Sequence, residues 1–445
     1  MGQIQKTKTK IVQKRGIEIA YLKADVLVVG AGCAGVMAAL QAARLGKKVV
    51  LADAAPLPGG QSTNANIGLF CGLYSRMPDH HRYTYGIVSD LLRELGQEGA
   101  LYYRDSGVTI SVVYDEQQLL RWIDRHLLAE GVTVLTGACI DQVEVSGRRV
   151  QAVQFLSRYG RVRVEATGFV DASGDAALTY AAGFPCRVSD EGPVYGTQMV
   201  VVDDVAPENL PPDQEVRQHI LEKAAAFGVE RHDGLAFFFP NRNRLVINMT
   251  HVATPLDPVE ASMESLRGRA NAERAYAFLK QEFPRAFAHA SVHSYGQTGI
   301  RQTRWIMGEH QLTAQEVRDG VHFPDAIART TWPIELHDTL ETHQWEPFDN
   351  EHVHYVPFGA MTPGDADNLV AAGRCIDADL IALSSVRVMG PCMAMGMAAA
   401  HALDLAGTGS VHKILIAQLQ DRVRDNLERC DPLAADLAGA KQKEE

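Results

Sequence analysis

The sequence has 445 residues, of which 46% are hydrophobic, so it can fill more than one hydrophobic core. Its formal net charge of −11 at pH 7 argues against nucleic acid or an anionic membrane surface as the main partner. No apolar run approaches the roughly 18 to 20 residues that cross a bilayer, so we expect no membrane span.

The seven cysteines are scattered along the chain, and no two of them have Cys-x-x-Cys spacing. This usage fits a reducing cytoplasm better than a disulfide framework or a zinc site. The basic segment Lys6–Lys10 lacks the apolar core of a signal peptide. We therefore expect a cytoplasmic protein without a metal site.

The first strong pattern is a strand, a tight turn and a helix. The apolar run Val26–Val29 stops at Gly30, and Gly32 and Gly35 complete G-x-G-x-x-G spacing before a helix of small residues. The first glycine permits the turn, and the second lets a pyrophosphate approach the backbone. The third lets the helix pack on the strand, with the helix N-terminus facing the phosphates. The pattern predicts a dinucleotide site.

The next segments agree with this prediction. A second apolar strand, Lys48–Ala52, ends in Asp53, about 20 residues past the glycines, where an acidic side chain can accept hydrogen bonds from ribose hydroxyls. Asp53 also argues against a 2′-phosphate. The loop Ala54–Asn66 is rich in glycine and short polar residues. It can be a surface turn, but its place in the chain favours a position along the dinucleotide.

A change of period follows two predicted helices. Residues 79–98 and 115–130 have the apolar spacing of amphipathic helices. Short strands joined by glycine-containing turns are then predicted at 132–136, 140–145, 150–156 and 162–166, and a further strand, 168–172, breaks at Ser173-Gly174-Asp175. A nicotinamide dehydrogenase does not need a β-meander and such a strand after its dinucleotide half.

This order of motifs, GAGCAG, Asp53, GGQST, a meander and VDASGD, resembles the FAD-dependent oxidoreductases of the glutathione-reductase-like superfamily. More closely, it is similar to the branch related to fumarate reductase and succinate dehydrogenase flavoproteins. Downstream stretches resemble blocks of the bacterial FAD-dependent oxidoreductase family, namely residues 299–304, 334–338, 368–376 and 385–396. The resemblance implies FAD as the cofactor, and it leaves the substrate open.

The resemblance also implies cofactor contacts. It places the glycine motif and Ala34 at the pyrophosphate, Asp53 and Ala54 at the adenosine ribose, and the second loop toward the flavin. Arg374 stands where many relatives have an aspartate on the ribityl chain, so that contact is not transferred to its side chain. The implied cofactor residues are Gly30, Gly32, Ala34, Gly35, Asp53, Ala54, Gly59, Gly60, Gln61, Ser62, Thr63, Cys139, Ala172, Ser173, Gly174, Gly373, Arg374, Val388 and Met389.

The predicted fold is α/β, with a Rossmann-like FAD-binding domain that contains a parallel sheet and the meander, and an inserted α+β substrate domain. The predicted boundaries are 1–186 and 346–410 for the FAD domain, 187–345 for the substrate domain, and 411–445 for a C-terminal helical cap and tail. A helix of small residues at 391–405 has Pro391 near its first turn, as helix starts favour. Its N-terminus is expected at the flavin.

The predicted chemistry is hydride transfer to flavin N5 from a C–H bond of a small polar metabolite, neutral or anionic. Such a reaction needs a base and an anchor. His337 and Arg301 are the predicted catalytic pair. Arg304 and Arg387 are further candidate anchors for an anion, although each can instead form a structural ion pair. His352 and His354 share one face of a predicted strand that borders either the pocket or solvent.

Two other functions stay open at this stage. One is a flavin-dependent monooxygenase, which the absence of a second glycine-rich nucleotide unit disfavours. The other is a non-catalytic FAD-binding protein with a protein partner. The electron acceptor, which can be oxygen, a quinone or a carrier protein, is not predicted, and neither is the presence of a homo-oligomer.

Overall fold

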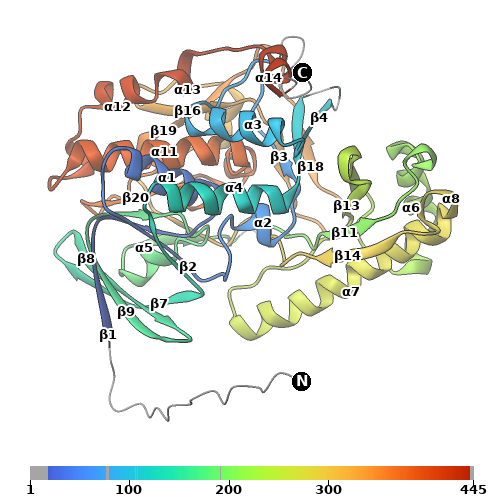
Figure 1. The fold of residues 1–445 in the computed structure, drawn as a ribbon, viewed down its shortest axis with the longest axis horizontal. Coiled ribbons are helices and arrows are strands. Elements are labelled where there is room, and N and C mark those ends of the chain that lie inside the picture. Colours follow the sequence, from blue (N-terminus) through green and yellow to red (C-terminus); the bar gives the residue numbers. More distant parts are fainter. Residues whose placement is uncertain (1–18, 77–79, 106, 108, 191, 441–445) are drawn as a thin grey trace, which may run out of the picture.

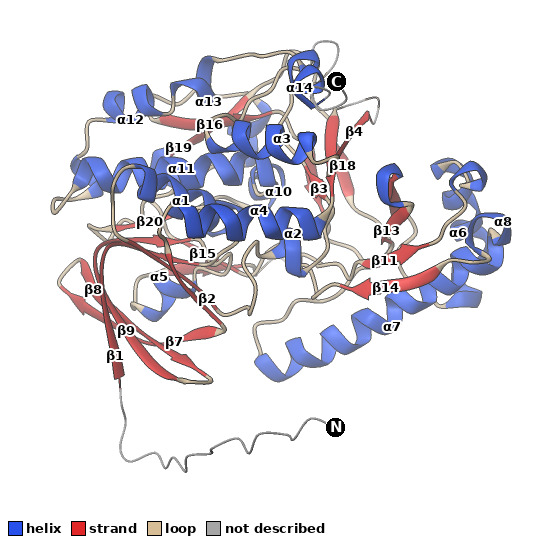
Figure 2. Cartoon of the chain, viewed as in Figure 1, coloured by secondary structure: helices blue, strands red, loops and turns tan. Residues whose placement is uncertain are grey.

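The structure is a computed structural model, and it describes residues 19–76, 80–105, 107, 109–190 and 192–440. Residues 1–18, at the start of the predicted FAD domain, and the tail 441–445 lie outside the described residues, as does Asp79 at the start of one predicted helix. Helices and strands alternate from residue 19 to residue 105, and four strands follow one another between residues 133 and 171 (Figures 1 and 2).

The central sheet joins the dinucleotide unit to the meander. Among the described residues its strand order is β6-β2-β1-β9-β8-β7, and β20 also pairs with β9. The pairs β1–β2, β2–β6, β1–β9 and β20–β9 are parallel, whereas β7–β8 and β8–β9 are antiparallel. The strands are β1 Ile19–Val29, β2 Val49–Asp53, β6 Thr133–Thr136, β7 Ala138–Ser146, β8 Arg149–Ser157, β9 Gly160–Asp171 and β20 Leu369–Ala371.

Two details of this region differ from the sequence predictions. The strands predicted at 162–166 and 168–172 form one strand, β9, because pairing with β1 continues past Thr167 to Gly168 and beyond. The helix predicted at 79–98 begins only at Ile87, because the preceding residue, Gly86, has a φ of +70°, which is not helical.

The helices that cover the central sheet pack closely on one another. Helix α1 follows the glycine turn and lies beside α11, the helix of small residues near the C-terminus (Figure 1). Buried side chains of α1, α3, α4 and α11 share one hydrophobic core. The helices of this part are α1 Cys33–Arg44, α2 Gln61–Asn64, α3 Ile87–Gln97, α4 Glu116–Ala129, α5 Ala177–Ala181, α9 Ala314–Arg318, α10 Leu380–Val386, α11 Met389–Ala406, α12 Ile416–Arg422, α13 Arg424–Glu428 and α14 Leu433–Ala440.

A second sheet lies within residues 187–345. Its order is β12-β13-β11-β14, all antiparallel, and its own core packs against α6 and α7. The long helix α7 runs beneath this sheet in Figure 1. The elements are β11 Val200–Asp203, α6 Asp213–Phe227, β12 Leu235–Phe239, β13 Arg244–Asn248, α7 Pro258–Glu282, α8 Pro284–Phe287 and β14 Ser291–Tyr295. The predicted domain boundaries themselves stay predictions.

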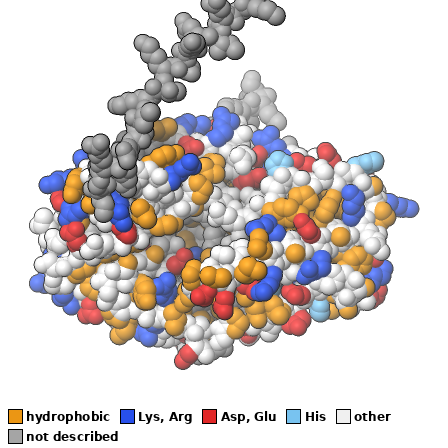
Figure 3. All heavy atoms as spheres, turned by 90° about the horizontal axis from the view of Figure 1, so that it is seen from below, with side chains coloured by type: hydrophobic (Ala, Val, Ile, Leu, Met, Phe, Trp, Pro, Cys, Tyr) orange, Lys and Arg blue, Asp and Glu red, His pale blue; other side chains and the backbone are white. Residues whose placement is uncertain are grey.

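Small sheets join the two parts. β10 pairs with β15, β16 with β19 and β17 with β18, while β3, β5 and β4 form a sheet beside the second loop. Seen from below, the surface is hollowed near its centre, and side chains of both charges are spread around it (Figure 3). These strands are β3 Leu69–Phe70, β4 Leu101–Asp105, β5 Ile110–Tyr114, β10 Cys186–Val188, β15 Arg304–Ile306, β16 Ala326–Thr330, β17 Ile334–Leu336, β18 Gln344–Glu346 and β19 His354–Pro357.

Candidate active site

One large cavity, of about 730 Å³, lies between the carboxyl ends of the parallel strands and the second sheet. Ligands of open α/β sheets bind at this edge. The chain returns to it from β1, β9 and β20, and the second sheet supplies the opposite wall. Of the predicted residues, the cavity is lined by Gly32, Ala34, Asp53, Gly60, Gln61, Ser62, Ala172, Ser173, Gly174, Arg301, Gly373, Arg374, Val388 and Met389.

Two glycines of the motif are required because backbone atoms lie too close to them for any side chain. A Cβ on Gly30, whose φ is +99°, would lie 2.2 Å from the carbonyl oxygen of Ala172, and a Cβ on Gly35 would lie 1.7 Å from the carbonyl oxygen of Gly30. These two glycines shape the turn without lining the cavity. At Gly32 the nearest atom to a Cβ is 4.0 Å away. The space beside Gly32 is therefore open to a ligand.

The N-terminus of α1 is the phosphate-binding feature of the groove, and the Asp53 carboxylate is its candidate acceptor for ribose hydroxyls. Helix α1 begins without a side-chain cap, so its first N–H groups can donate to a phosphate. The Asp53 carboxylate accepts hydrogen bonds from the backbone N–H groups of Ala31 and Ala55 while it lines the cavity. Burial raises the pKa of Asp53 against the opposing effect of those two bonds. Asp53 thus lines the cavity, and its contact with a ribose stays a prediction.

The second loop packs directly on the first. A Cβ on Gly60 would lie 2.6 Å from the Cα of Gly32, so the two glycine loops touch. Gln61 donates from Nε2 to the carbonyl of Ile300 at 2.7 Å and thereby ties the loop to the segment before Arg301. Gly59, Thr63 and Ala54 do not line the cavity; Thr63 instead donates to the carbonyl of Pro58 at 2.7 Å.

Arg374 supplies a cation to the same groove. Its Nη2 lies 3.6 Å from Asp175, and its guanidinium would be 2.3 Å from a Cβ on Gly174. Within the described chain, its buried Nη1 has no hydrogen-bond partner. An unpartnered buried guanidinium nitrogen costs free energy, and a phosphate oxygen would satisfy it. The groove thus fits a pyrophosphate. The ribityl contact that relatives make with an aspartate is not assigned to the side chain of Arg374.

Several other candidates lie away from the cavity. Cys139 is exposed on β7 and does not line it. Arg304 stacks on Tyr180, with its guanidinium carbon 4.0 Å from the ring centroid. His354 is buried and bonds through Nε2 to Ser385 at 2.8 Å and through Nδ1 to His352 at 3.1 Å. The shared face of His352 and His354 is thus an interior hydrogen-bonded face.

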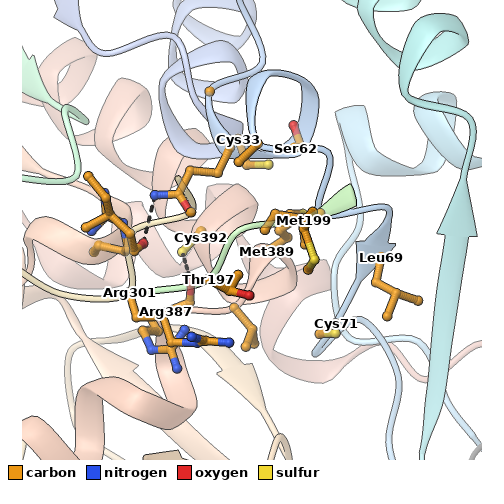
Figure 4. A pocket seen from close by; sticks show the side chains of 18 of the residues that line it. Cys33, Ser62, Leu69, Cys71, Thr197, Met199, Arg301, Arg387, Met389 and Cys392 are labelled. Carbon is orange, nitrogen blue, oxygen red and sulfur yellow. Dashed lines mark hydrogen bonds between the residues drawn. The ribbon is translucent and has the colours of Figure 1, made fainter. Parts of the chain in front are cut away.

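Two arginines lie side by side in the cavity, at the end where Val388 and Met389 line it. Figure 4 shows Arg301 and Arg387 adjacent, close to Thr197 and Met389. Arg301 donates to the carbonyl of Tyr195 at 2.8 Å, and Arg387 donates to that of Glu335 at 3.1 Å. Neither forms an ion pair with a carboxylate of the described residues. Burial and neighbouring arginines lower the pKa of both guanidinium groups.

Glu335 stands where His337 was expected. Glu335 lines the cavity, and His337 lies fully buried behind it, with Nε2 3.0 Å from Oε1 of Glu335. Residues two apart on a strand share a face, but β17 ends at Leu336, and His337 lies beyond it and is buried. Burial raises the pKa of Glu335, but His337, Arg387 and Arg301 together hold it well below its usual range.

A histidine that the sequence analysis did not single out also lines the cavity. His343 bonds through Nδ1 to Oδ2 of Asp233, and its backbone N–H donates to the same oxygen at 3.0 Å. Arg231 donates from Nε to Oδ1 of Asp233 at 2.7 Å. The pKa of Asp233 is lowered well below its usual range by these partners, against the effect of burial. An ionised aspartate on Nδ1 leaves Nε2 of His343 free to accept a proton.

No sequence signal could have found this pair, because His343 and Asp233 are 110 residues apart and neither lies in a recognisable motif.

The fold and the groove together define a Rossmann-type dinucleotide-binding protein with a second sheet that faces the ligand. The chain belongs to the FAD dependent oxidoreductase family, whose model matches residues 25–423. It is therefore an oxidoreductase with FAD as its cofactor. The uncapped α1 N-terminus, Asp53 and the unpartnered nitrogen of Arg374 fit the ADP half of that cofactor.

Solved structures of similar fold have low sequence identity. A geranylgeranyl bacteriochlorophyll reductase-like protein of Thermoplasma acidophilum is 12% identical over 95% of this chain and 88% of that chain, with a TM-score of 0.48. The p-nitrophenol 4-monooxygenase of Pseudomonas putida DLL-E4 is 13% identical over 96% of this chain and 90% of that chain, with a TM-score of 0.43. No curated protein matches the sequence significantly.

Within the described residues, no single helix is long and apolar enough to cross a membrane. The pair α10 and α11 meets the length and composition only when taken together, and the two helices are bent by 88° at their junction.

Proposed function

We propose that this chain oxidises a C–H bond that carries a hydroxyl or amino group in a small carboxylate, and passes the hydride to flavin N5. The observation that carries the proposal is the pair of adjacent guanidinium groups of Arg301, which is buried, and Arg387, which is half-buried. The single carboxylate of Glu335 offsets both charges, and it forms an ion pair with neither among the described residues. Guanidinium groups bind carboxylates with two parallel hydrogen bonds. A substrate carboxylate would supply the negative charge that these two guanidinium groups still need.

The second part of the proposal is the proton acceptor. Bound FAD supplies hydride acceptance at N5. His343 takes the proton of the substrate hydroxyl or ammonium at Nε2, because Asp233 holds Nδ1–H and stabilises the imidazolium. Trp332 and His337 hold the carboxylate of Glu335 in place beside Arg387. Arg301 and Arg387 fix the carboxylate end, and the reacting carbon is thereby oriented.

The order of the sequence motifs supports a place for the chain near the fumarate reductase and succinate dehydrogenase flavoproteins. Those motifs do not indicate which electron acceptor reoxidises the flavin, so the test below also distinguishes oxygen from other acceptors.

The test is anaerobic bleaching of the bound flavin by a panel of 2-hydroxy and 2-amino carboxylates, with the matching uncharged alcohols and amines as controls. We expect carboxylates alone to bleach it. Readmission of oxygen then separates an oxidase, which recolours at once, from a dehydrogenase that needs another acceptor. Bleaching by NADPH with hydroxylation of an aromatic substrate would favour a monooxygenase instead.

Variants locate the reaction in this cavity. Arg301→Gln and Arg387→Gln should each weaken the apparent affinity for the carboxylate about 10- to 100-fold, since each removes a charged hydrogen bond. His343→Gln should slow flavin reduction about 100-fold or more. Arg304→Gln is the matched control, because Arg304 lies outside the cavity on Tyr180. If the Arg304 and Arg301 variants weakened the affinity for the carboxylate equally, Arg301 would not be its anchor.

A further inference from the structure

A second pocket, of about 380 Å³, lies behind the cavity wall formed by Glu335. It is bordered by Tyr195, His251 and Leu340 on one side and by helix α7 on the other. Its remaining lining residues are Glu230, Ala253, Glu264, Arg267, Ala270, Asn271 and Arg274. Nothing in the proposed reaction uses this pocket, yet a continuous line of hydrogen bonds joins it to the main cavity.

That line consists of three side chains. Glu335 accepts from Trp332 at Oε2 and lies 3.0 Å from Nε2 of His337 at Oε1. Nδ1 of His337 lies 2.8 Å from Nε2 of His251, and Nδ1 of His251 lies 2.9 Å from the carbonyl oxygen of Leu340. His337 and His251 are 0% and 1% exposed, so no solvent replaces any of these contacts.

The one fixed acceptor at the end of the line decides how many protons its three contacts need if each is a hydrogen bond. A carbonyl oxygen only accepts, so His251 must carry its proton on Nδ1, which leaves Nε2 as an acceptor. His337 must then donate from Nδ1, and a neutral His337 has no proton left for Glu335. If each imidazole carries one proton, the contact between Nε2 of His337 and the Glu335 carboxylate brings two lone pairs together without a proton. Three protons satisfy all three contacts, and the line is then neutral overall.

We propose that Glu335, His337 and His251 conduct a proton between the flavin cavity and the second pocket. When the carboxyl group of Glu335 takes up a proton, the proton that lies between Glu335 and His337 moves to Nε2 of His337. His337 passes its Nδ1 proton to Nε2 of His251. The Nδ1 proton of His251 leaves to water when its bond to Leu340 opens. One proton enters and one leaves, and no electrons move. Both imidazole rings must then rotate to bring their protons back to the starting positions before the line passes another proton.

The need for such a path rests on the proposed function. Oxidation of H–C–O–H to C=O releases two protons with its two electrons whenever the final acceptor takes electrons alone. His343 accommodates one proton, and the line through Glu335 provides a second exit. His337 and His251 do not touch the substrate; they position and relay.

The charges around the line are mixed. Arg301 and Arg231 lower the pKa of His337 in addition to burial, and Glu335 opposes them. Burial together with Arg231 and Arg301 lowers the pKa of His251 to about 3, against the opposing effect of Leu340 and Asp233. The ring of His343 stacks on His337 with centroids 4.9 Å apart. On the pocket side the charged neighbours are Glu230, Glu264, Arg267 and Arg274.

The first test counts protons by NMR of the FAD-bound protein labelled with ¹⁵N-histidine. We expect His251 as the Nδ1–H tautomer, a proton on Nδ1 of His337, and a third, strongly downfield proton between Nε2 of His337 and Glu335. In Glu335→Gln the amide donates to Nε2, so only the third signal should disappear. A wild-type line with two protons would overturn the proposal.

The second test asks where the proton leaves. Ala253→Leu narrows the second pocket and should slow exchange of the His251 Nδ1 proton with water at least tenfold, whereas Glu335→Gln should leave it unchanged. The reverse result would place the exit in the main cavity and contradict the relay. Neither measurement uses a substrate. A failed bleaching panel with both NMR results intact would therefore reject the proposed function alone.

Discussion

At the scale of single residues, the groove separates glycines that shape the fold from a glycine that makes room for the cofactor. Gly30 and Gly35 are enclosed by backbone atoms, whereas a Cβ on Gly32 would meet only the Cα of Gly60, at 4.0 Å. The same three-glycine motif therefore contains two different constraints, and substitutions can tell them apart.

Gly32→Ala should fold with a stability close to that of the wild type but bind FAD at least tenfold more weakly, because its methyl group occupies the space into which the pyrophosphate fits. Gly35→Ala should fail to fold or lose several kcal/mol, since its Cβ would lie 1.7 Å from a backbone oxygen. Thermal unfolding of the FAD-free proteins and flavin titration measure the two effects. Equal loss of stability in both variants would contradict the distinction.

Most residues predicted for the ADP end line the cavity, whereas His337, predicted for the reactive end, does not. Gly32, Asp53 and Gly60 line the cavity as their local motif implies, because each acts through backbone positions next to it in sequence. His337 was expected at the substrate, but Glu335, two residues earlier, lines the cavity instead. Residues two apart on a strand share a face, but His337 lies beyond the end of β17 at Leu336, so strand alternation does not set its direction and no pattern in the sequence resolves it.

At the scale of elements, the contact between α1 and α11 determines how the C-terminal part of the chain reaches the groove. Gly396 of α11 faces the backbone of α1, and a Cβ there would lie 2.0 Å from the carbonyl oxygen of Ala34. The small residues of α11 let the two helices approach until backbone meets backbone, which brings Val388 and Met389 to the cavity.

Gly396→Ala should therefore destabilise the protein by about 1 to 3 kcal/mol through overpacking, although alanine favours a helix by about 1 kcal/mol over glycine. Gly364→Ala is the control, since no atom lies within 4 Å of a Cβ at that position. Thermal unfolding gives both values. A stabilised Gly396 variant would mean that helix propensity outweighs the close contact.

Elements with strong local patterns were predicted from the sequence with small errors. The helix predicted at 115–130 is α4, at Glu116–Ala129, because its apolar stripe and the Asp115 cap are both local. Strand β9 was divided in two at Thr167-Gly168, where a glycine suggested an end. Its continuity comes from pairing with β1, which is more than a hundred residues away, and local propensity does not contain that information.

At the scale of the whole molecule, three histidines make the fold sensitive to acid: His251 and His354, which are buried, and His401, which is half-buried. Burial, aided by neighbouring positive charge, lowers the pKa of His251 and of His354 to about 3, and that of His401 to about 4. In the unfolded chain each has a pKa of about 6.5. Below that value the unfolded chain binds protons that the folded protein excludes, so stability falls as the pH decreases from about 6.5 toward about 4.

Each of these histidines should cost about 1.4 kcal/mol at pH 5.5 relative to pH 7.5, by proton linkage. The unfolding midpoint of the FAD-bound protein should therefore decrease between those pH values. His401→Leu removes one titrating group, whose Nδ1 has no hydrogen-bond partner in the described part of the chain, and should reduce the loss of stability between the two pH values by about 1.4 kcal/mol. The exposed His289→Gln is the control and should leave the decrease unchanged. If the decrease in His401→Leu equals that of the wild type, then His401 is already protonated in the fold at pH 5.5, and burial does not govern its titration.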